Sequence, residues 1–237
     1  MQLLARTRGT VVACCRAPES ALPEVHDVRL RRVRLDVRCD TSIAALRDAL
    51  GDRVDLLLNA AGVLHEPGQA PERALADVDR QWLQNSFDVN CAGAVLVSQA
   101  LAPAMRRRAV RPLDEDAGGA ARSSQLPTSV VANLSARVGS ISDNRLGGWY
   151  SYRISKAALN MATKTMALEL KRQRTIVVAL HPGTTDTDLS KPFQKNVKND
   201  KLFPVDFTAT QLLDIVDGLT LDHTGGFFAW DGQPIDF

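Results

Sequence analysis

The chain has 237 residues, of which 45% are hydrophobic and 24% charged, and its formal net charge at pH 7 is +2. This composition is ordinary for a globular protein with a substantial core, and the length suits one α/β domain. A charge this small does not indicate a nucleic-acid-binding protein, so we interpret the arginine-rich stretches at 30–38 and 106–111 as solvated surface. No run of 18 apolar residues occurs, so no membrane-spanning helix and no membrane partner are expected.

The chain contains four cysteines: Cys14, Cys15, Cys39 and Cys91. They form no CxxC pair and no histidine cluster accompanies them, which predicts no metal site and a reducing compartment. The arginine-rich start contains no long apolar stretch of the kind found in secretory signals. It is faintly similar to an organelle transit peptide, but the VVACC within it is typical of a strand, and we expect a cytoplasmic protein.

Strand and helix patterns alternate along the chain. The predicted strands are 10–15, 33–37, 55–62, 129–136, 175–183 and 225–230. The predicted helices are 41–50, 78–107, 149–173 and 209–219. The strands are almost continuously apolar, as parallel strands covered on both faces are, and the alternation predicts a doubly wound α/β fold. We expect a single domain over 1–237, with the Gly-, Pro- and Ser-rich stretch 111–128 as a surface-loop insertion.

Small and polar residues follow several of the predicted strands. One strand runs into Asn59, Ala60, Ala61 and Gly62, another reaches Asp36, and a third ends in the HPG of 181–183. Ligands of open α/β sheets bind at the carboxyl ends of the strands, and small residues allow the backbone to approach a ligand closely. These strand ends are therefore the expected ligand site.

The helix predicted over 149–173 begins with Tyr152 and Lys156, one turn apart. Residues at i and i+4 are neighbours on a helix surface. The pKa of a free tyrosine is about 10, too high for ready proton exchange at pH 7. A neighbouring ammonium favours the phenolate and lowers that pKa. The pair is a candidate for acid catalysis, and an exposed surface pair is the alternative.

In combination, these motifs resemble the short-chain dehydrogenases/reductases, which are Rossmann-fold oxidoreductases. The matching elements are NAAG at 59–62, VN at 89–90, a serine upstream of Tyr152-x-x-x-Lys156, and PGTTDT at 182–187. Within the family, the segments 135–161 and 225–235 are most similar to the sniffer-type carbonyl reductases and the C-factor proteins. The similarity covers residues 3 to 237.

The resemblance implies roles for four catalytic residues. Tyr152 would donate a proton to a carbonyl oxygen while hydride arrives from a nicotinamide, and Lys156 would also hold the ribose hydroxyls. Asn90 would support a water that relays protons to Lys156. The substrate would be a small hydrophobic aldehyde, ketone or quinone, and the stretch 188–204 lies where relatives carry a mobile lid.

The resemblance also requires a serine hydroxyl that stabilises the charge developing on the substrate oxygen. Ser140 lies 152 − 140 = 12 residues before the tyrosine, close to the family spacing, and is the residue we favour. Alignment on the strand end instead places the family serine at Ala136, beside Ser135.

Arg16, at the end of the first predicted strand, indicates the cofactor. An acidic residue there would favour NAD, whereas an arginine suits the 2′-phosphate of NADP. The resemblance further implies that Asp36 accepts from the adenine amino group. Pro182, Gly183, Thr185 and Thr187 would meet the carboxamide and phosphates.

The family's first strand and its TGxxxGxG turn have no counterpart in the 237 residues. MQLLARTRG resembles only the last turns of the helix that follows that turn, so we expect an N-terminally truncated Rossmann-like sheet. Two strand edges would then lack a partner, or the neighbouring strands would close up and pair. Two functions stay open: an NADP-dependent carbonyl reductase, and a catalytically impaired isoform or non-enzymatic relative that acts through protein contacts. Many relatives form homodimers through the helices at 78–107 and 149–173, and that assembly is open here.

Overall fold

The computed structural model describes residues 1–21, 25–65, 68–107 and 128–237. Its helices are α1 Gln2–Arg6, α2 Pro18–Ala21, α3 Asp40–Leu50, α4 Arg80–Phe87, α5 Gly93–Met105, α6 Tyr150–Leu170 and α7 Val205–Asp217. Its strands are β1 Val11–Cys15, β2 Leu30–Arg34, β3 Leu56–Asn59, β4 Ser129–Leu134, β5 Thr175–His181, β6 Thr184–Thr185, β7 Leu202–Phe203 and β8 Phe227–Ala229. A π-helical turn, η2 (Asp88–Ala92), joins α4 to α5, and a 3-10 turn, η3 (Arg137–Gly139), follows β4.

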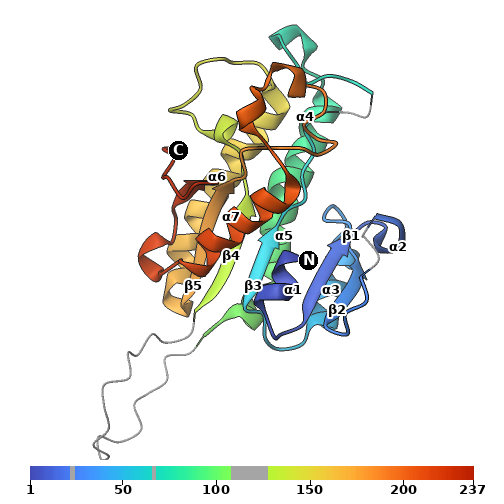
Figure 1. Ribbon diagram of the computed structural model, residues 1–237, viewed down its shortest axis with the longest axis vertical. Helices are drawn as coiled ribbons and strands as arrows, with labels where there is room; N and C mark the ends of the chain where they lie inside the picture. The colour runs from blue at the N-terminus through green and yellow to red at the C-terminus, as the bar shows by residue number, and fades with distance from the viewer. Residues whose placement is uncertain (22–24, 66–67, 108–127) are drawn as a thin grey trace, which may run out of the picture.

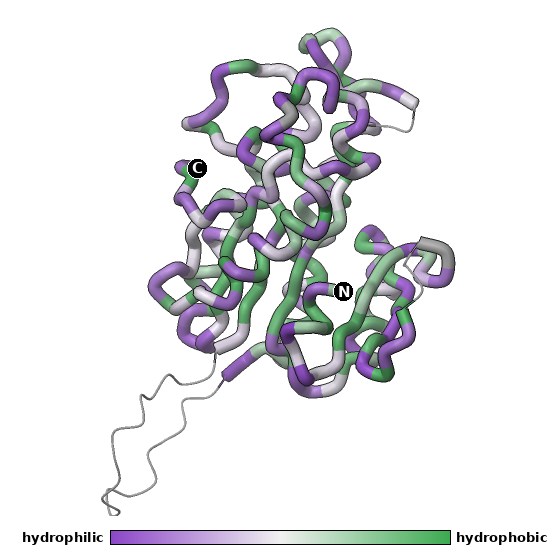
Figure 2. The backbone as a smooth tube through the Cα atoms, viewed as in Figure 1, coloured by the Kyte–Doolittle hydropathy of each residue, from purple (hydrophilic) through white to green (hydrophobic). Residues whose placement is uncertain are grey.

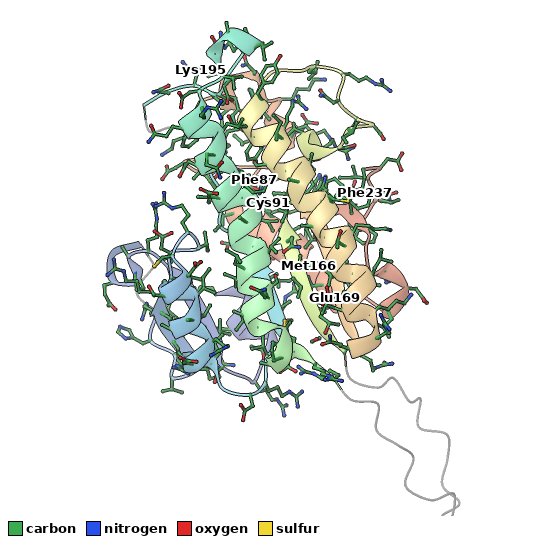
Figure 3. The ribbon with its side chains drawn as sticks, turned by 180° about the vertical axis from the view of Figure 1, so that it is seen from behind. Phe87, Cys91, Met166, Glu169, Lys195 and Phe237 are labelled. Atoms are coloured by element: carbon green, nitrogen blue, oxygen red, sulfur yellow. The ribbon has the colours of Figure 1, made fainter. Side chains whose placement is uncertain are left out.

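The strands form parallel sheets that lie between two layers of helices. The main sheet has the order β3-β4-β5-β8, and every paired strand in the described residues runs parallel to its neighbour. Helices α1 and α7 lie over one face (Figure 1), while α3, α5 and α6 lie over the other (Figure 3). The expected doubly wound, Rossmann-like architecture is confirmed.

The core follows from the apolar strands. Residues 175–180 of β5 are all buried, and the tube is most hydrophobic along β3, β4 and β5 (Figure 2). On the rear face, Val131 and Val177 pack with Val97, Leu101 and Met105 of α5. Strands that helices cover on both faces are almost continuously apolar, which is why their apolar runs predicted them well.

The sheet is divided between β1 and β3. In the described residues, β1 pairs only with β2, with Val11 opposite Leu30, and both lie outside the four-stranded sheet. The division falls where the resemblance expects a further strand, so the expected loss of edge partners is confirmed. The alternative, in which the neighbouring strands close up and pair, is wrong.

Three other expectations change. β2 begins and ends three residues before the predicted strand 33–37, so Asp36 lies beyond the strand. The helix predicted over 78–107 is interrupted by the π-helical turn at Asp88–Ala92. The insertion predicted at 111–128 lies almost entirely outside the described residues.

Candidate active site

Tyr152 and Lys156 lie on the first turns of α6, on its buried side. Tyr152 is 8% exposed and Lys156 is 3% exposed, so the surface-pair alternative is wrong. The Lys156 Nζ lies 5.7 Å from the centroid of the Tyr152 ring and donates a hydrogen bond to the Leu134 carbonyl at 2.7 Å. The lysine therefore joins the tyrosine to the carboxyl end of β4, where a ligand of this fold is expected.

Burial sets the protonation of both groups. It raises the pKa of Tyr152, so burial and not Lys156 decides the direction of the shift. The expectation of a phenol pKa below its ordinary value is thus not met. Burial lowers the pKa of Lys156 to about 8, partly opposed by Cys91. At neutral pH Tyr152 keeps its proton, as an acid must, beside a lysine that is still mostly charged.

Asn90 lies in the π-helical turn and fixes the loop after β3. Its Oδ1 accepts from the Val63 amide at 2.8 Å, and its Nδ2 donates to the Val63 carbonyl at 2.8 Å and to the Ser155 hydroxyl at 2.9 Å. A Cβ on Gly62 would lie 3.4 Å from Asn90 Oδ1 and 3.7 Å from Lys156 Nζ. The structure therefore brings Gly62, Asn90 and Lys156 together. Single π-helical turns inside α-helices are common at functional sites.

The two serines have different environments. The Ser135 hydroxyl donates to Asn160 Oδ1 at 2.6 Å, so it ties the end of β4 to α6. The Ser140 hydroxyl is buried and accepts from the Asp143 amide at 3.1 Å. Ala136 packs in the same cluster as Tyr152 and can supply no hydroxyl. Of these two serines, Ser140 is thus the one whose hydroxyl hydrogen makes no hydrogen bond within the described part of the chain.

Gly139 places Ser140 next to α6, the helix that carries Tyr152 and Lys156. A Cβ on Gly139 would lie 2.7 Å from the Cβ of Lys156 and 2.8 Å from its carbonyl carbon. Asn160 Nδ2 also donates to the Gly139 carbonyl at 3.2 Å. Only glycine lets the chain pass this close to Lys156, so the position of Ser140 depends on it.

The residues expected at the adenosine end lie on the β1–β2 sheet. Arg16 is exposed and lines a hollow of about 550 Å³ with Arg34, which lies at the end of β2. Asp36 already pairs with Arg38, whose backbone and side-chain hydrogen bonds lower the pKa of this carboxyl, with a further contribution from Arg16.

The residues expected at the other strand ends lie on the four-stranded sheet. Asn59 turns its amide inward, where it donates to Asn133 Oδ1 at 2.8 Å and Ser98 Oγ at 3.1 Å, whereas Ala60 and Ala61 are exposed. The Asn59 side chain is therefore used by the core, and contact with a ligand there falls to the backbone of 60–62.

The stretch from Pro182 to Phe203 covers the tyrosine. Gly183 has a φ of 72°, and a Cβ there would meet the Phe203 ring at 2.7 Å. The Thr185 hydroxyl bonds the Thr208 hydroxyl at 2.9 Å, and the Thr187 amide donates to Ser190 Oγ at 3.3 Å. Beyond them, Leu189 and Phe193 pack against the apolar cluster that contains Tyr152, and the Phe193 ring lies 5.0 Å from that of Trp149. The Tyr152 side chain, which would face the substrate, is thus enclosed by apolar groups.

Sequence reasoning missed several residues that support the site. The buried stripe of α6 is unusually polar and contains Ser151, Ser155, Asn160 and Thr163 together with Tyr152 and Lys156. Polar residues three or four positions apart on a core-facing stripe were a readable signal. Glu72 and Arg153 gave no such signal, because Glu72 bonds Ser151, 79 residues away, and Arg153 bonds backbone carbonyls of the turns before α6.

A metal ion and a membrane are two further candidate partners. Among the described residues, no group of three or more His, Cys, Asp or Glu side chains could hold a metal ion. In the same part of the chain, no helix is long and apolar enough to cross a membrane.

Comparison with known proteins identifies the family of this chain. A family described as enoyl-(acyl carrier protein) reductase matches residues 2–111, and one described as short chain dehydrogenase matches 130–198. The C-signal protein of Myxococcus xanthus is 34% identical over 77% of this chain and 92% of its own length. The chain belongs to the short-chain dehydrogenase/reductase family. A second family member, 1-hydroxy-2-glutathionyl-2-methyl-3-butene dehydrogenase of Rhodococcus sp., is 32% identical over 84% of this chain and 76% of its own length.

Solved structures of the family have the same fold. The carbonyl reductase Sniffer of D. melanogaster superposes with a TM-score of 0.80 at 22% identity, and the NADPH-bound carbonyl reductase from chicken fatty liver with a TM-score of 0.77 at 24% identity. Each comparison covers 100% of this chain and 92% of the other. The resemblance to sniffer-type carbonyl reductases and C-factor-like proteins is confirmed, and the chain is an oxidoreductase by family.

Proposed function

We propose that this protein reduces the carbonyl group of a small hydrophobic aldehyde, ketone or quinone with NADPH. The observation that carries the proposal is the buried Tyr152–Lys156 pair at the end of β4, which is covered by apolar side chains and lies beside Ser155, the α6 residue that Asn90 bonds. A buried tyrosine that keeps its proton, beside a cation, is suited to hand that proton to a developing alkoxide. Two solved structures with this fold, the chicken carbonyl reductase and a short-chain dehydrogenase/reductase from Burkholderia multivorans, contain NADPH and NADP respectively.

The residues present fit a dinucleotide at its two ends. Near Lys156, Gly62 leaves open the space that a Cβ would occupy, 3.7 Å from the lysine Nζ, which suits a group that the ammonium binds. At the other end, Arg16 and Asp36 lie just after β1 and β2, where an arginine favours the 2′-phosphate of NADP over NAD. The glycine-rich turn that would meet the pyrophosphate is absent from the sequence.

In this mechanism Tyr152 gives its proton to the substrate oxygen. Lys156 stabilises the phenolate that is left and binds the ribose hydroxyls, and its own hydrogen bond to Leu134 fixes its position. Ser140 donates to the same substrate oxygen with the hydrogen that the fold leaves unused. Bound NADPH supplies the hydride. Asn90 holds the loop at Val63 and the π-helical turn that a proton-relaying water would contact.

The apolar cover selects the substrate class. Leu64, Ala136, Leu189 and Phe193 surround Tyr152, and Trp149 packs on both aromatic rings, 6.4 Å from that of Tyr152 and 5.0 Å from that of Phe193. A carbonyl compound with an apolar or aromatic body would bury its surface here without leaving a charge unpaired. The segment with Leu189 and Phe193 must open to admit it, since Tyr152 is only 8% exposed.

Two measurements test the proposal. NADPH titrated into the protein should enhance its fluorescence at micromolar concentration, and a panel of aldehydes, ketones and quinones should include substrates. Tyr152→Phe should lower kcat by about 10²- to 10⁴-fold, the usual contribution of a general acid. Tyr150→Phe makes the same chemical change two residues earlier and is the control. A folded sample with neither NADPH binding nor turnover would refute the proposal.

The divided sheet favours the second candidate, a family member that acts through protein contacts. β1 and β2 are separated from the four-stranded sheet, so the Arg16 and Tyr152 ends of the site rest on different sheets. This arrangement would weaken binding of a ligand that must contact both. Failure of NADPH to bind at millimolar concentration, with the fold intact by circular dichroism, would support this candidate.

We also propose a homodimer through the rear face. On this face α5 and α6 lie side by side (Figure 3), and α6 exposes Ile154, Met161 and Leu168, which recur every seven residues. Phe87 and Leu96 are exposed on the neighbouring helices. Burying these side chains would favour association. Sedimentation velocity should show a dimer that Met161→Glu with Leu168→Glu dissociates, and an unchanged monomer in the wild type would contradict it.

A further inference from the structure

Glu72 is a buried carboxylate that no catalytic role of the family requires. It lies in the segment between Gly68 and α4, and it is 7% exposed. Its Oε1 accepts from the Ser151 amide at 3.1 Å and also from the Ser151 hydroxyl through a short hydrogen bond. Its backbone carbonyl accepts from the Trp149 amide at 2.6 Å. One residue thus binds the start of the helix that carries Tyr152.

α6 depends on this distant contact because it does not cap itself. The residue at its N-cap position is Trp149, whose side chain makes no capping hydrogen bond. The first N–H groups of a helix have no partner within the helix and must find one elsewhere. Glu72, 79 residues away in sequence, supplies acceptors for two of them. Both segments lie at the same end of the molecule (Figure 1).

Glu72 also holds the turn before α6 in an unusual conformation. Gly147, Gly148 and Trp149 have φ values of 63°, 66° and 53°, and such a φ is rare for a bulky residue such as tryptophan. A Cβ on Gly148 would lie 3.4 Å from the Glu72 carbonyl oxygen, so the two backbones pack closely. Conformations of this kind persist only where the surroundings fix them. The turn is what aims the Trp149 ring at Tyr152.

We infer that Glu72 is a positioning residue for Tyr152, acting through Ser151 and Trp149. The expected effect of Glu72 on kcat rests on the proposed function. Its expected effect on the start of α6 rests on the hydrogen bonds alone. Without the carboxylate, the Ser151 amide and hydroxyl lose their acceptor and the left-handed turn loses part of its support. Tyr152, the next residue, then shifts relative to Lys156 and the substrate, while the residues that meet the adenosine stay in place.

Kinetics of three variants test this. Glu72→Ala should lower kcat by about 10- to 100-fold, the effect of a small displacement of a reacting group, and leave KM for NADPH within about twofold. Glu72→Gln keeps the Oε1 acceptor and should restore most of kcat. Asp77→Ala is the matched control, because the Asp77 carboxylate accepts from the amides of Arg73 and Ala74 in the same segment but does not contact α6. Unchanged kcat in Glu72→Ala, or an equal loss in Asp77→Ala, would overturn the inference.

Hydrogen exchange gives a readout that needs no activity. The amides of Trp149 and Ser151 should exchange at least about tenfold faster in Glu72→Ala than in the wild type, and Asp77→Ala should leave them protected. If Glu72→Ala does not fold, Ser151→Ala removes only the hydroxyl donor and should lower kcat by a smaller factor, again with KM for NADPH unchanged. If the wild type shows no carbonyl reduction, the proposed function fails, and exchange then decides the role of Glu72. Unchanged exchange at 149–151 would overturn it.

Discussion

Replacing Lys156 with methionine measures what burying this cation costs the fold. Burial lowers the pKa of Lys156 from its ordinary 10.5 to about 8. Below pH 8 both the folded and the unfolded chain carry the proton, and the full penalty of holding the charge in the core is present. Between pH 8 and 10.5 the unfolded chain binds more protons than the folded one, so the free energy of unfolding rises with pH. These two pKa values give a gain of about 2.5 kcal/mol between pH 7 and pH 10, which methionine lacks.

Urea unfolding at pH 7 and pH 10 provides the assay. The wild type should gain stability relative to Lys156→Met over this range, and the variant should be at least as stable as the wild type at pH 7. Lys171→Met removes an exposed lysine just after the same helix and should leave the pH dependence as in the wild type. A difference between wild type and Lys156→Met that does not change from pH 7 to pH 10 would refute the reasoning. It would mean that water reaches Lys156 and leaves its pKa near 10.5.

Two further variants test neighbouring parts of the site. Gly139→Ala places a Cβ 2.7 Å from the Cβ of Lys156, so it should lower the free energy of unfolding in urea by about 1–3 kcal/mol and lower kcat. Gly218→Ala is the control, because a Cβ there meets nothing closer than 3.6 Å, and it should change neither quantity. Equal effects of the two variants would contradict the close packing at Gly139. His181 has a pKa lowered to about 4, mainly by burial, so its charging opposes folding as the pH falls below 6.5. Relative to His181→Asn, the wild type should lose about 3 kcal/mol of unfolding free energy between pH 7 and pH 4, and parallel pH profiles would show that the imidazole is solvated.

The sequence predicted the parts of the fold that local chemistry determines. β4 and β5 are apolar along most of their length because helices cover both faces, and this pattern is readily distinguished from a loop. The predicted strand lies three residues later than β2 because three of the five residues of β2 are arginines, two of them exposed, which makes LRRVR look polar. A half-exposed strand gives a weaker signal than a buried one.

Long-range contacts could not be predicted in the same way. Asn59 lies at a strand end, where family motifs predict ligand contact, yet its amide is committed to Asn133 and Ser98, which come from other elements. The π-helical turn at Asn90 follows from hydrogen bonds to Val63 and Ser155, 27 and 65 residues away. The motif of Tyr152 and Lys156 identified the pair, but only their burial decides which pKa moves and in which direction.

The divided sheet leads to a last prediction about cooperativity. The β1–β2 sheet joins the rest of the core mainly through α3, whose Ile43 and Leu46 pack in one cluster with α5, and β1 has no buried residue. Amides of β2 should therefore exchange faster with solvent than those of β5, whose residues 175–180 are all buried. Saturating NADPH should slow exchange in β1 and β2 if Arg16 and Tyr152 contact the same molecule, because binding would then join the two sheets. Equal protection of the two sheets without NADPH would show that packing of α3 on α5 alone makes them one cooperative unit.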